Sequence, residues 1–156
     1  MMQNHILFNK VSEPYGWLGN MSPYAVDYAG HCFKTVEHAF QISRLGFDHD
    51  MFDALLRIKS PMALKMSIKA MRKDFIYEPL SQTDIEWMQT FLMFKFHQHP
   101  DLAKQLKETG DAVLVEDVSN RKNKGAALFW GGYLEDGKLV GENKLGQLLM
   151  QVRKHL

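Results

Sequence analysis

A helix that carries one lysine among large apolar side chains is the strongest constraint on the fold. Of the ten residues from Trp87 to Phe96 ("WMQTFLMFKF"), seven are large and apolar. The i, i+3, i+7, i+10 spacing of a core-facing stripe is followed by Ile85, Met88, Leu92 and Lys95. Phenylalanines crowd both flanks of this stripe, so the pattern predicts a helix over 81–99 that is buried nearly all round.

Lys95 is the chemically interesting residue of this helix, and periodicity leaves two interpretations open. In the first, the lysine stem packs on apolar surface while the ammonium reaches water. In the second, the amine is desolvated and its pKa falls, which is the condition under which a lysine becomes a nucleophile.

The size and composition of the chain are those of an ordinary globular protein. Its 156 residues predict one domain over 1–156, with 46% apolar and 24% charged residues. The net charge of +1 lacks the excess of positive charge that is typical of a general nucleic-acid binder. One cysteine, Cys32, excludes an internal disulfide, and a lone buried thiol is expected there rather than a nucleophile. No apolar run approaches the roughly 20 residues of a membrane span, and no signal peptide is evident, so a cytoplasmic protein is expected.

Helices outnumber strands in the predicted secondary structure, so we expect an α+β fold, a compact, mostly helical single domain with a few short strands. Capping residues support the helices that begin after Thr35 and Ser60, the latter with Pro61 in the first helical position. The expected helices are 35–46, 50–59, 60–73, 81–99, 100–109 and 143–156. The expected strands are 5–10 and 111–118, with turns and short strands over 13–33, and a long loop over 119–143 that contains a possible strand at 127–130.

The helix over 35–46 carries three polar residues on one face. Glu37, Gln41 and Arg44 recur at spacings of four and three. Glu37 lies in the first turn, where the helix dipole favours a carboxylate whatever its function. A solvated face is therefore as good an interpretation as a functional one.

Glycine-rich segments near the C-terminus form the other candidate site. "GENKLG" lacks the Lys and Ser/Thr of a Walker loop, but Gly141 and Asn143 precede a helix N-terminus that can hold an anion. Capping by Asn143 explains the same residues equally well. Trp130 in "FWGG" is either a core aromatic or a stacking platform for a flat ligand. His97 and His99 do not converge on one metal, and no metal site is expected.

Several stretches together resemble, in chain order, the NADAR (YbiA-like) family. They are "YGWLGNMSPYAVDYAGHCFKTVEHAFQ", "SPMALKM", "FKFHQHPDLAKQLKETGDAVLVED", "FWGG" and "GENKLGQLLMQVR", and the resemblance spans about residues 6–155. The family implies a compact, mostly helical α+β domain. It also implies N-glycosidase chemistry, either removal of ADP-ribose from guanine or hydrolysis of ribosylated pyrimidine intermediates of riboflavin synthesis.

The resemblance implies roles for particular residues of this sequence. The family glutamate of the "EH" pair falls on Glu37, and the family lysine, thought to form an imine with the sugar, falls on Lys95. The substrate-binding residues that it implies are Asn20, Gln41, Arg44, Trp130, Gly131, Asn143 and Gly146, with Gly141 and Leu145 completing the "G-x-N-x-L-G" block. No cofactor is implied.

This chain departs from the family pattern at a few positions. Ala127 stands where the family commonly has an aspartate, three residues before the tryptophan, and Arg44 stands where a lysine is frequent. Gly19 replaces a serine, and Ser67–Ile68 replaces a "GR" pair. Glu116 or Asp117 could take the place of the missing aspartate if the following loop folds back.

Three functions are consistent with the sequence. The first is an N-glycosidase acting on an ADP-ribosyl or ribosylamino substrate, as a small molecule or within nucleic acid. The second is a non-catalytic module that binds ADP-ribose or an NAD-related nucleotide. The third is a plain interaction domain without a ligand.

Overall fold

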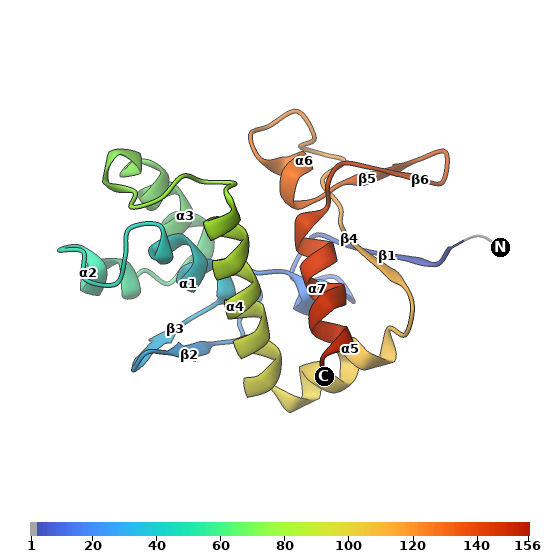
Figure 1. Cartoon of the computed structure of the whole chain (residues 1–156), viewed down its shortest axis with the longest axis horizontal. Helices are drawn as coiled ribbons and strands as arrows, with labels where there is room; N and C mark the ends of the chain where they lie inside the picture. The colour runs from blue at the N-terminus through green and yellow to red at the C-terminus, as the bar shows by residue number, and fades with distance from the viewer. Residues whose placement is uncertain (1–2) are drawn as a thin grey trace. The chain divides into compact units, whose positions relative to one another are not determined.

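A computed structural model describes residues 3–156 and confirms the predicted α+β class (Figure 1). The helices are α1 (Val36–Ser43), α2 (Phe52–Leu56), α3 (Pro61–Lys69), α4 (Gln82–Gln98), α5 (Pro100–Glu108), α6 (Ala127–Trp130) and α7 (Lys144–Lys154), with 3-10 turns at Gly16–Leu18 and Arg72–Asp74. The strands are β1 (His5–Phe8), β2 (Val26–Tyr28), β3 (His31–Phe33), β4 (Val113–Glu116), β5 (Tyr133–Glu135) and β6 (Lys138–Val140).

Two structural units make up the described chain. The middle unit is Asn20–Gln98. The terminal unit combines the described residues up to Gly19 with His99–Leu156.

The middle unit is built around α1, which packs against both α3 and α4 (Figure 1). The predicted N-caps of two helices are confirmed: the Thr35 side chain accepts a hydrogen bond from the His38 N–H, and the Ser60 side chain accepts one from the Ala63 N–H. β2 and β3 form an antiparallel hairpin whose turn residues, Ala29 and Gly30, both have positive φ. Fully buried side chains in this unit include Val26, Phe33, Ala39, Ile42, Leu64, Ile68, Phe91 and Leu92.

Helix α4 lies within the predicted range, but it is buried on one face only. Met88, Leu92 and Lys95 of the predicted stripe are buried, whereas Ile85 is half-buried. Phe94 is 36% exposed, so the expectation of burial all round is wrong. Phe94 lies outside the stripe of Met88, Leu92 and Lys95, so the helical rotation turns its side chain away from the buried face.

In the terminal unit, β1 of the N-terminal segment pairs in parallel with β4 of the C-terminal segment. Helix α7 packs against β4, and Gly146 makes the close approach possible. A Cβ on Gly146 would stand 2.0 Å from the Leu114 carbonyl oxygen, which is inside any allowed contact. Helix α7 buries Leu145, Leu148, Leu149 and Val152 on one side.

The long loop expected over 119–143 contains regular structure that the sequence did not predict. Residues 127–130 form the short helix α6 and not a strand, because the Gly131 and Trp130 N–H groups donate to the carbonyls of Ala127 and Ala126. β5 and β6 then form a hairpin, with positive φ at both Asp136 and Gly137. Asp-Gly is a preferred pair for such a two-residue turn.

Smaller differences concern single elements and residues. The helix expected over 50–59 is limited to Phe52–Leu56, and the one expected over 60–73 ends at Lys69. Cys32 is exposed, so the expected buried thiol is wrong, and a hydrogen bond with Asp27 raises the pKa of its thiol. None of the helices in residues 3–156 has both the length and the apolar character needed to cross a bilayer.

Candidate active site

The Lys95 amine is enclosed within the middle unit. The side chain has 0% exposure, and Nζ donates to the Ser22 Oγ at 3.1 Å. Two aromatic rings surround the amine, with Nζ 5.7 Å from the Tyr24 ring centroid and 5.4 Å from that of Phe96. The interpretation in which the ammonium reaches water is therefore wrong. Desolvation lowers the pKa of Lys95 from 10.5 to about 7, so near neutral pH a large share of the amine is uncharged.

Glu37 lies in the first turn of α1 and is also buried. All eight residues of this helix are buried, so the interpretation of a solvated face is wrong. The backbone N–H of Glu37 donates to the Asn20 carbonyl at 3.0 Å, and its carboxylate Oε1 accepts from the Gln41 Nε2 at 2.9 Å. Within the described chain these side-chain contacts leave the second carboxylate oxygen, Oε2, available to a ligand.

His38, the second residue of the "EH" pair, has a structural environment. Its Nε2 lies 2.7 Å from the Ile58 carbonyl, which can only accept, so Nε2 carries the proton. Nδ1 then accepts from the Thr35 hydroxyl at 2.8 Å. Burial lowers the pKa of His38, and both ring nitrogens are occupied. The histidine therefore anchors the start of α1 in its neutral form.

The segment Asn20–Ser22 connects the two predicted catalytic residues. Asn20 accepts the backbone N–H of Glu37, and two residues later the Ser22 hydroxyl accepts from the Lys95 amine. The Asn20 side-chain Nδ2 donates to the Met88 Sδ at 3.2 Å, on the same face of α4 as Lys95. Its Oδ1 is buried and has no hydrogen-bond partner in residues 3–156. One short segment thus brings Glu37, Lys95 and an unused acceptor into one cluster.

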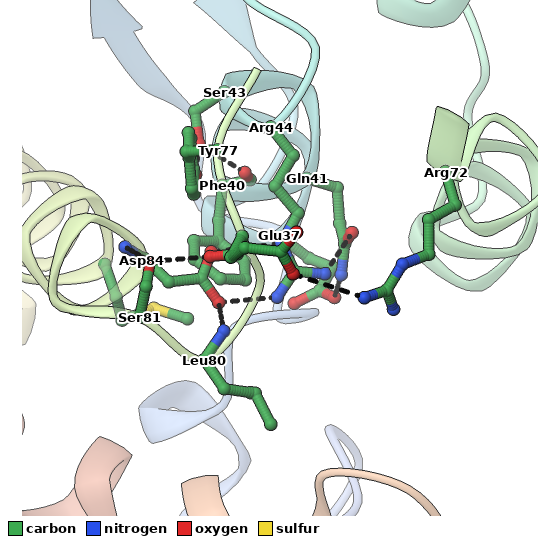
Figure 2. A network of polar contacts seen from close by, with 12 residues as sticks. Glu37, Phe40, Gln41, Ser43, Arg44, Arg72, Tyr77, Leu80, Ser81 and Asp84 are labelled. Carbon is green, nitrogen blue, oxygen red and sulfur yellow. Dashed lines mark hydrogen bonds and ion pairs between the residues drawn. The ribbon is translucent and has the colours of Figure 1, made fainter. Parts of the chain in front are cut away.

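Gln41 and Arg44 extend this cluster into a buried polar network (Figure 2). The Arg44 Nη1 donates to the Gln41 Oε1 at 3.3 Å. The Arg44 Nε and Nη2 donate to the two carboxylate oxygens of Asp84 at 3.0 and 2.7 Å. Asp84 is fully buried and also accepts the Leu80 N–H at 2.8 Å.

Asp84 is the residue of this network that the sequence interpretation missed. The signal available was the S-x-x-D pattern of Ser81 and Asp84, which is typical of a capped helix start. The Asp84 N–H does donate to the Ser81 hydroxyl, at 3.4 Å. Nothing in that pattern points to Arg44, which lies forty residues earlier.

The remaining predicted site residues belong to the terminal unit. Trp130 ends α6, is half-buried, and meets the Phe129 ring edge-on at a centroid separation of 4.9 Å. Gly131 follows it at a point where a Cβ would stand 2.4 Å from the Glu116 carbonyl oxygen and 3.1 Å from the Glu116 Oε1. The Glu116 carboxylate therefore lies beside Gly131 of the "WG" pair.

Asn143 precedes α7 but does not cap it through its side chain. Its φ of 51° is left-handed, and no cap hydrogen bond forms. Instead its Nδ2 donates to the Leu114 carbonyl at 2.8 Å, and its Oδ1 accepts the Glu116 N–H at 3.2 Å. The capping prediction is wrong because the left-handed backbone turns this amide toward β4. The side chain thereby ties α7 to the strand that carries Glu116.

The chain is similar to known proteins over nearly its whole length. The family model of the NADAR domain matches residues 7–156. N-glycosidase YbiA of Escherichia coli (strain K12) is 32% identical and is aligned over the whole of this chain and 91% of its own length. Riboflavin biosynthesis protein VVA0006 of Vibrio vulnificus is 30% identical, and this chain covers 40% of its length. The NMR structure of E. coli YbiA matches with a TM-score of 0.80 and 28% identity, over 99% of this chain and 86% of that one.

These relatives place the enzyme among the N-glycoside hydrolases. The structural match also accounts for the α+β arrangement of helices and short strands described above. With the family model matched from residue 7 to residue 156, the chain belongs to the NADAR family.

Proposed function

We propose that this N-glycosidase cleaves the bond between the anomeric carbon of a ribose and a base nitrogen, and that it removes ADP-ribose from ADP-ribosylated guanine in nucleic acid. The observation that carries the proposal is the buried amine of Lys95, hydrogen-bonded to Ser22 in the same cluster as Glu37. An amine with a pKa of about 7 is nucleophilic at neutral pH, whereas an exposed lysine is almost fully protonated there.

In the proposed reaction Lys95 is the nucleophile, and Glu37 stabilises charge and transfers protons. The neutral amine attacks the anomeric carbon, the carbon–base bond breaks, and the base leaves with the bonding electrons and takes up a proton. The amine loses its protons as the sugar ring opens to an imine. Water then adds to the imine, and the free amine and the free sugar are regenerated. Glu37 stabilises the positive charge that develops at the anomeric carbon and moves these protons.

The neighbouring residues are proposed to bind the substrate. The buried Oδ1 of Asn20 is an acceptor for a sugar hydroxyl, because a substrate donor would satisfy the atom that the described chain leaves unpaired. Gln41 and Arg44 each keep N–H groups beyond those used in their mutual contacts. Trp130 is proposed to stack on a flat base, and Gly131, Asn143 and Gly146 to shape the backbone around it. The terminal-unit residues are tested separately from the Glu37–Lys95 pair.

A second substrate is favoured by one specific observation, the 30% identity to a relative named as a riboflavin biosynthesis protein. Ribosylamino-pyrimidine intermediates present the same bond between an anomeric carbon and nitrogen. The alternative of a non-catalytic module that only binds ADP-ribose gives no reason for burying an amine whose desolvation costs stability.

One experiment decides between these functions. The protein is incubated in parallel with an oligonucleotide containing ADP-ribosylated guanine and with a ribosylamino-pyrimidine, and released sugar is measured by mass spectrometry. Release of ADP-ribose from the oligonucleotide is the expected result. Release from the pyrimidine alone would transfer the proposal to the second substrate, and binding without release from either would support the non-catalytic module.

A further inference from the structure

Four side chains in the middle unit form a linear chain of hydrogen bonds that ends at the proposed catalytic carboxylate. The order is Asp84, Arg44, Gln41, Glu37 (Figure 2). The first member lies in the first turn of α4 and the other three lie on or directly after α1. The Arg44–Asp84 contact therefore connects the end of α1 to the start of α4, and Gln41 relays this contact back along α1 to Glu37.

The chemistry of these groups allows only one orientation of the Gln41 amide. Arg44 has donors and no acceptor, so it must face the amide oxygen. The Glu37 carboxylate has acceptors only, so it must face the amide nitrogen. Both requirements are met at the observed distances of 3.3 and 2.9 Å. If Arg44 moved, the amide would lose the contact that fixes its orientation toward Glu37.

Arg44 itself is fixed by Asp84 and by two aromatic rings. The carboxylate receives two parallel N–H groups, an arrangement that sets both the position and the plane of the guanidinium. The guanidinium carbon lies 4.7 Å from the Phe40 ring centroid and 5.9 Å from that of Phe75. Because Asp84 neutralises this cation, Glu37 is met by a neutral amide and is not drawn into an ion pair with Arg44.

We propose that Asp84 is a positioning residue for the catalytic carboxylate, acting through Arg44 and Gln41 to hold Glu37 in its reactive orientation. The inference rests on the proposed function, in which Glu37 handles protons at the anomeric carbon. Asp84 then has a role in catalysis besides its structural role at the start of α4. Gln41 and Arg44, which lie between Asp84 and Glu37 in the series of hydrogen bonds, transmit its effect.

A double-mutant cycle tests this transmission. Asp84→Asn keeps the shape and the acceptor for Leu80 but weakens the grip on Arg44, and it is expected to lower kcat about tenfold with little change in KM. In a Gln41→Ala background, where the transmitting amide is already absent, the same substitution should lower kcat less than about twofold. An equal loss in both backgrounds would overturn the proposal, since Asp84 would then act on activity without Gln41.

A matched control separates positioning from the general effect of an Asp→Asn change at a helix start. Asp53 lies in the first turn of α2, as Asp84 lies in that of α4, but it is exposed. Asp53→Asn should keep the wild-type kcat. If Asp84→Asn alone fails to fold, Arg44→Met combined with Asp84→Asn removes both charges, leaves neither unpaired, and should reproduce the loss of kcat.

A second measurement needs no turnover. The side-chain NH2 of Gln41, observed by NMR, should exchange with water about tenfold faster in Asp84→Asn than in the wild type, because its fixed hydrogen bonds open more often. Unchanged exchange would contradict the proposal even for an inactive protein. Absence of turnover in the wild type would count against the proposed function alone, so the two failures are distinguishable.

Discussion

The amine of Lys95 lies 3.1 Å from the hydroxyl of Ser22, and neither side chain is more than 1% exposed. A serine hydroxyl can donate to a neutral amine as readily as it accepts from an ammonium. It therefore holds the lysine in place without requiring it to be charged. An acidic partner would raise the pKa of the amine and remove the nucleophile.

An imine at Lys95 should be trapped during turnover. Borohydride added with substrate is expected to join the mass of the sugar to the peptide that contains Lys95, because reduction converts the imine to a stable amine. Lys95→Arg should abolish adduct and turnover, since a guanidinium is not a usable nucleophile. Lys95→Met, an uncharged side chain of similar length, should be inactive but folded. Active enzyme that gives no adduct, together with turnover by either variant, would leave Lys95 with a packing role only.

The activity should depend on the protonation of Lys95. The pKa of this amine is lowered to about 7, and the neutral form is the reactive one. The rate should therefore fall about tenfold for each pH unit below 7 and level off above it. A profile of kcat/KM from pH 5 to 9 measures this limb. If kcat/KM instead keeps rising up to pH 9, toward the ordinary pKa of lysine, the amine is solvated during the reaction.

Replacement of the Glu37 carboxylate by an amide should remove activity and keep the fold. The amide oxygen of Glu37→Gln can still accept from Gln41, but the side chain can no longer take up a proton, so we expect kcat to fall by about 10²–10⁴. Glu86→Gln, on the exposed face of α4, is the control and should keep full activity. Circular dichroism checks that both variants are folded. A kcat of Glu37→Gln close to the wild-type value would show that Glu37 has no catalytic role and only interacts favourably with the dipole of α1.

Trp130 should contribute to binding of the nucleotide. Trp130→Ala is expected to weaken ADP-ribose binding by about 1–3 kcal/mol, the range for loss of one aromatic–base stack. Trp130→Phe keeps an aromatic face and should retain most of the affinity. Isothermal titration calorimetry compares the three proteins. Equal affinity for a folded alanine variant would mean that the half-buried ring packs within its own unit and does not contact the ligand.

Local chemistry explains which parts of the fold were predictable. Thr35, Ser60 and Pro61 act on N–H groups within three residues, so their sequence positions are enough to place helix starts. Lys95 and Glu37 were proposed as catalytic residues from helical spacing and from the family motifs, and these roles stay predictions. The hairpin at Asp136–Gly137 was missed although its turn pair was present, because the loop was interpreted from its glycine and lysine content.

The features that the sequence did not predict depend on contacts between distant segments of the chain. The pairing of Asp84 with Arg44 spans forty residues, and no periodicity reports it. Asn143 has the right residue type and position for a cap, yet its amide binds β4, which lies about thirty residues earlier in the chain. The burial of α1 on all sides likewise depends on α3 and α4 packing against it. In each case tertiary structure changes the use of a side chain that local rules assign correctly by type.

Helix α4 carries both Asp84 in its first turn and Lys95 near its end. At 3.6 residues per turn, this separation of eleven residues is close to three full turns, so both side chains leave the same face at levels about 16 Å apart. Insertion or deletion of one residue between them would rotate one by about 100° relative to the other. Substitutions on the outer face of α4 can therefore accumulate, whereas the number of residues from 84 to 95 is constrained as strictly as the identity of either end.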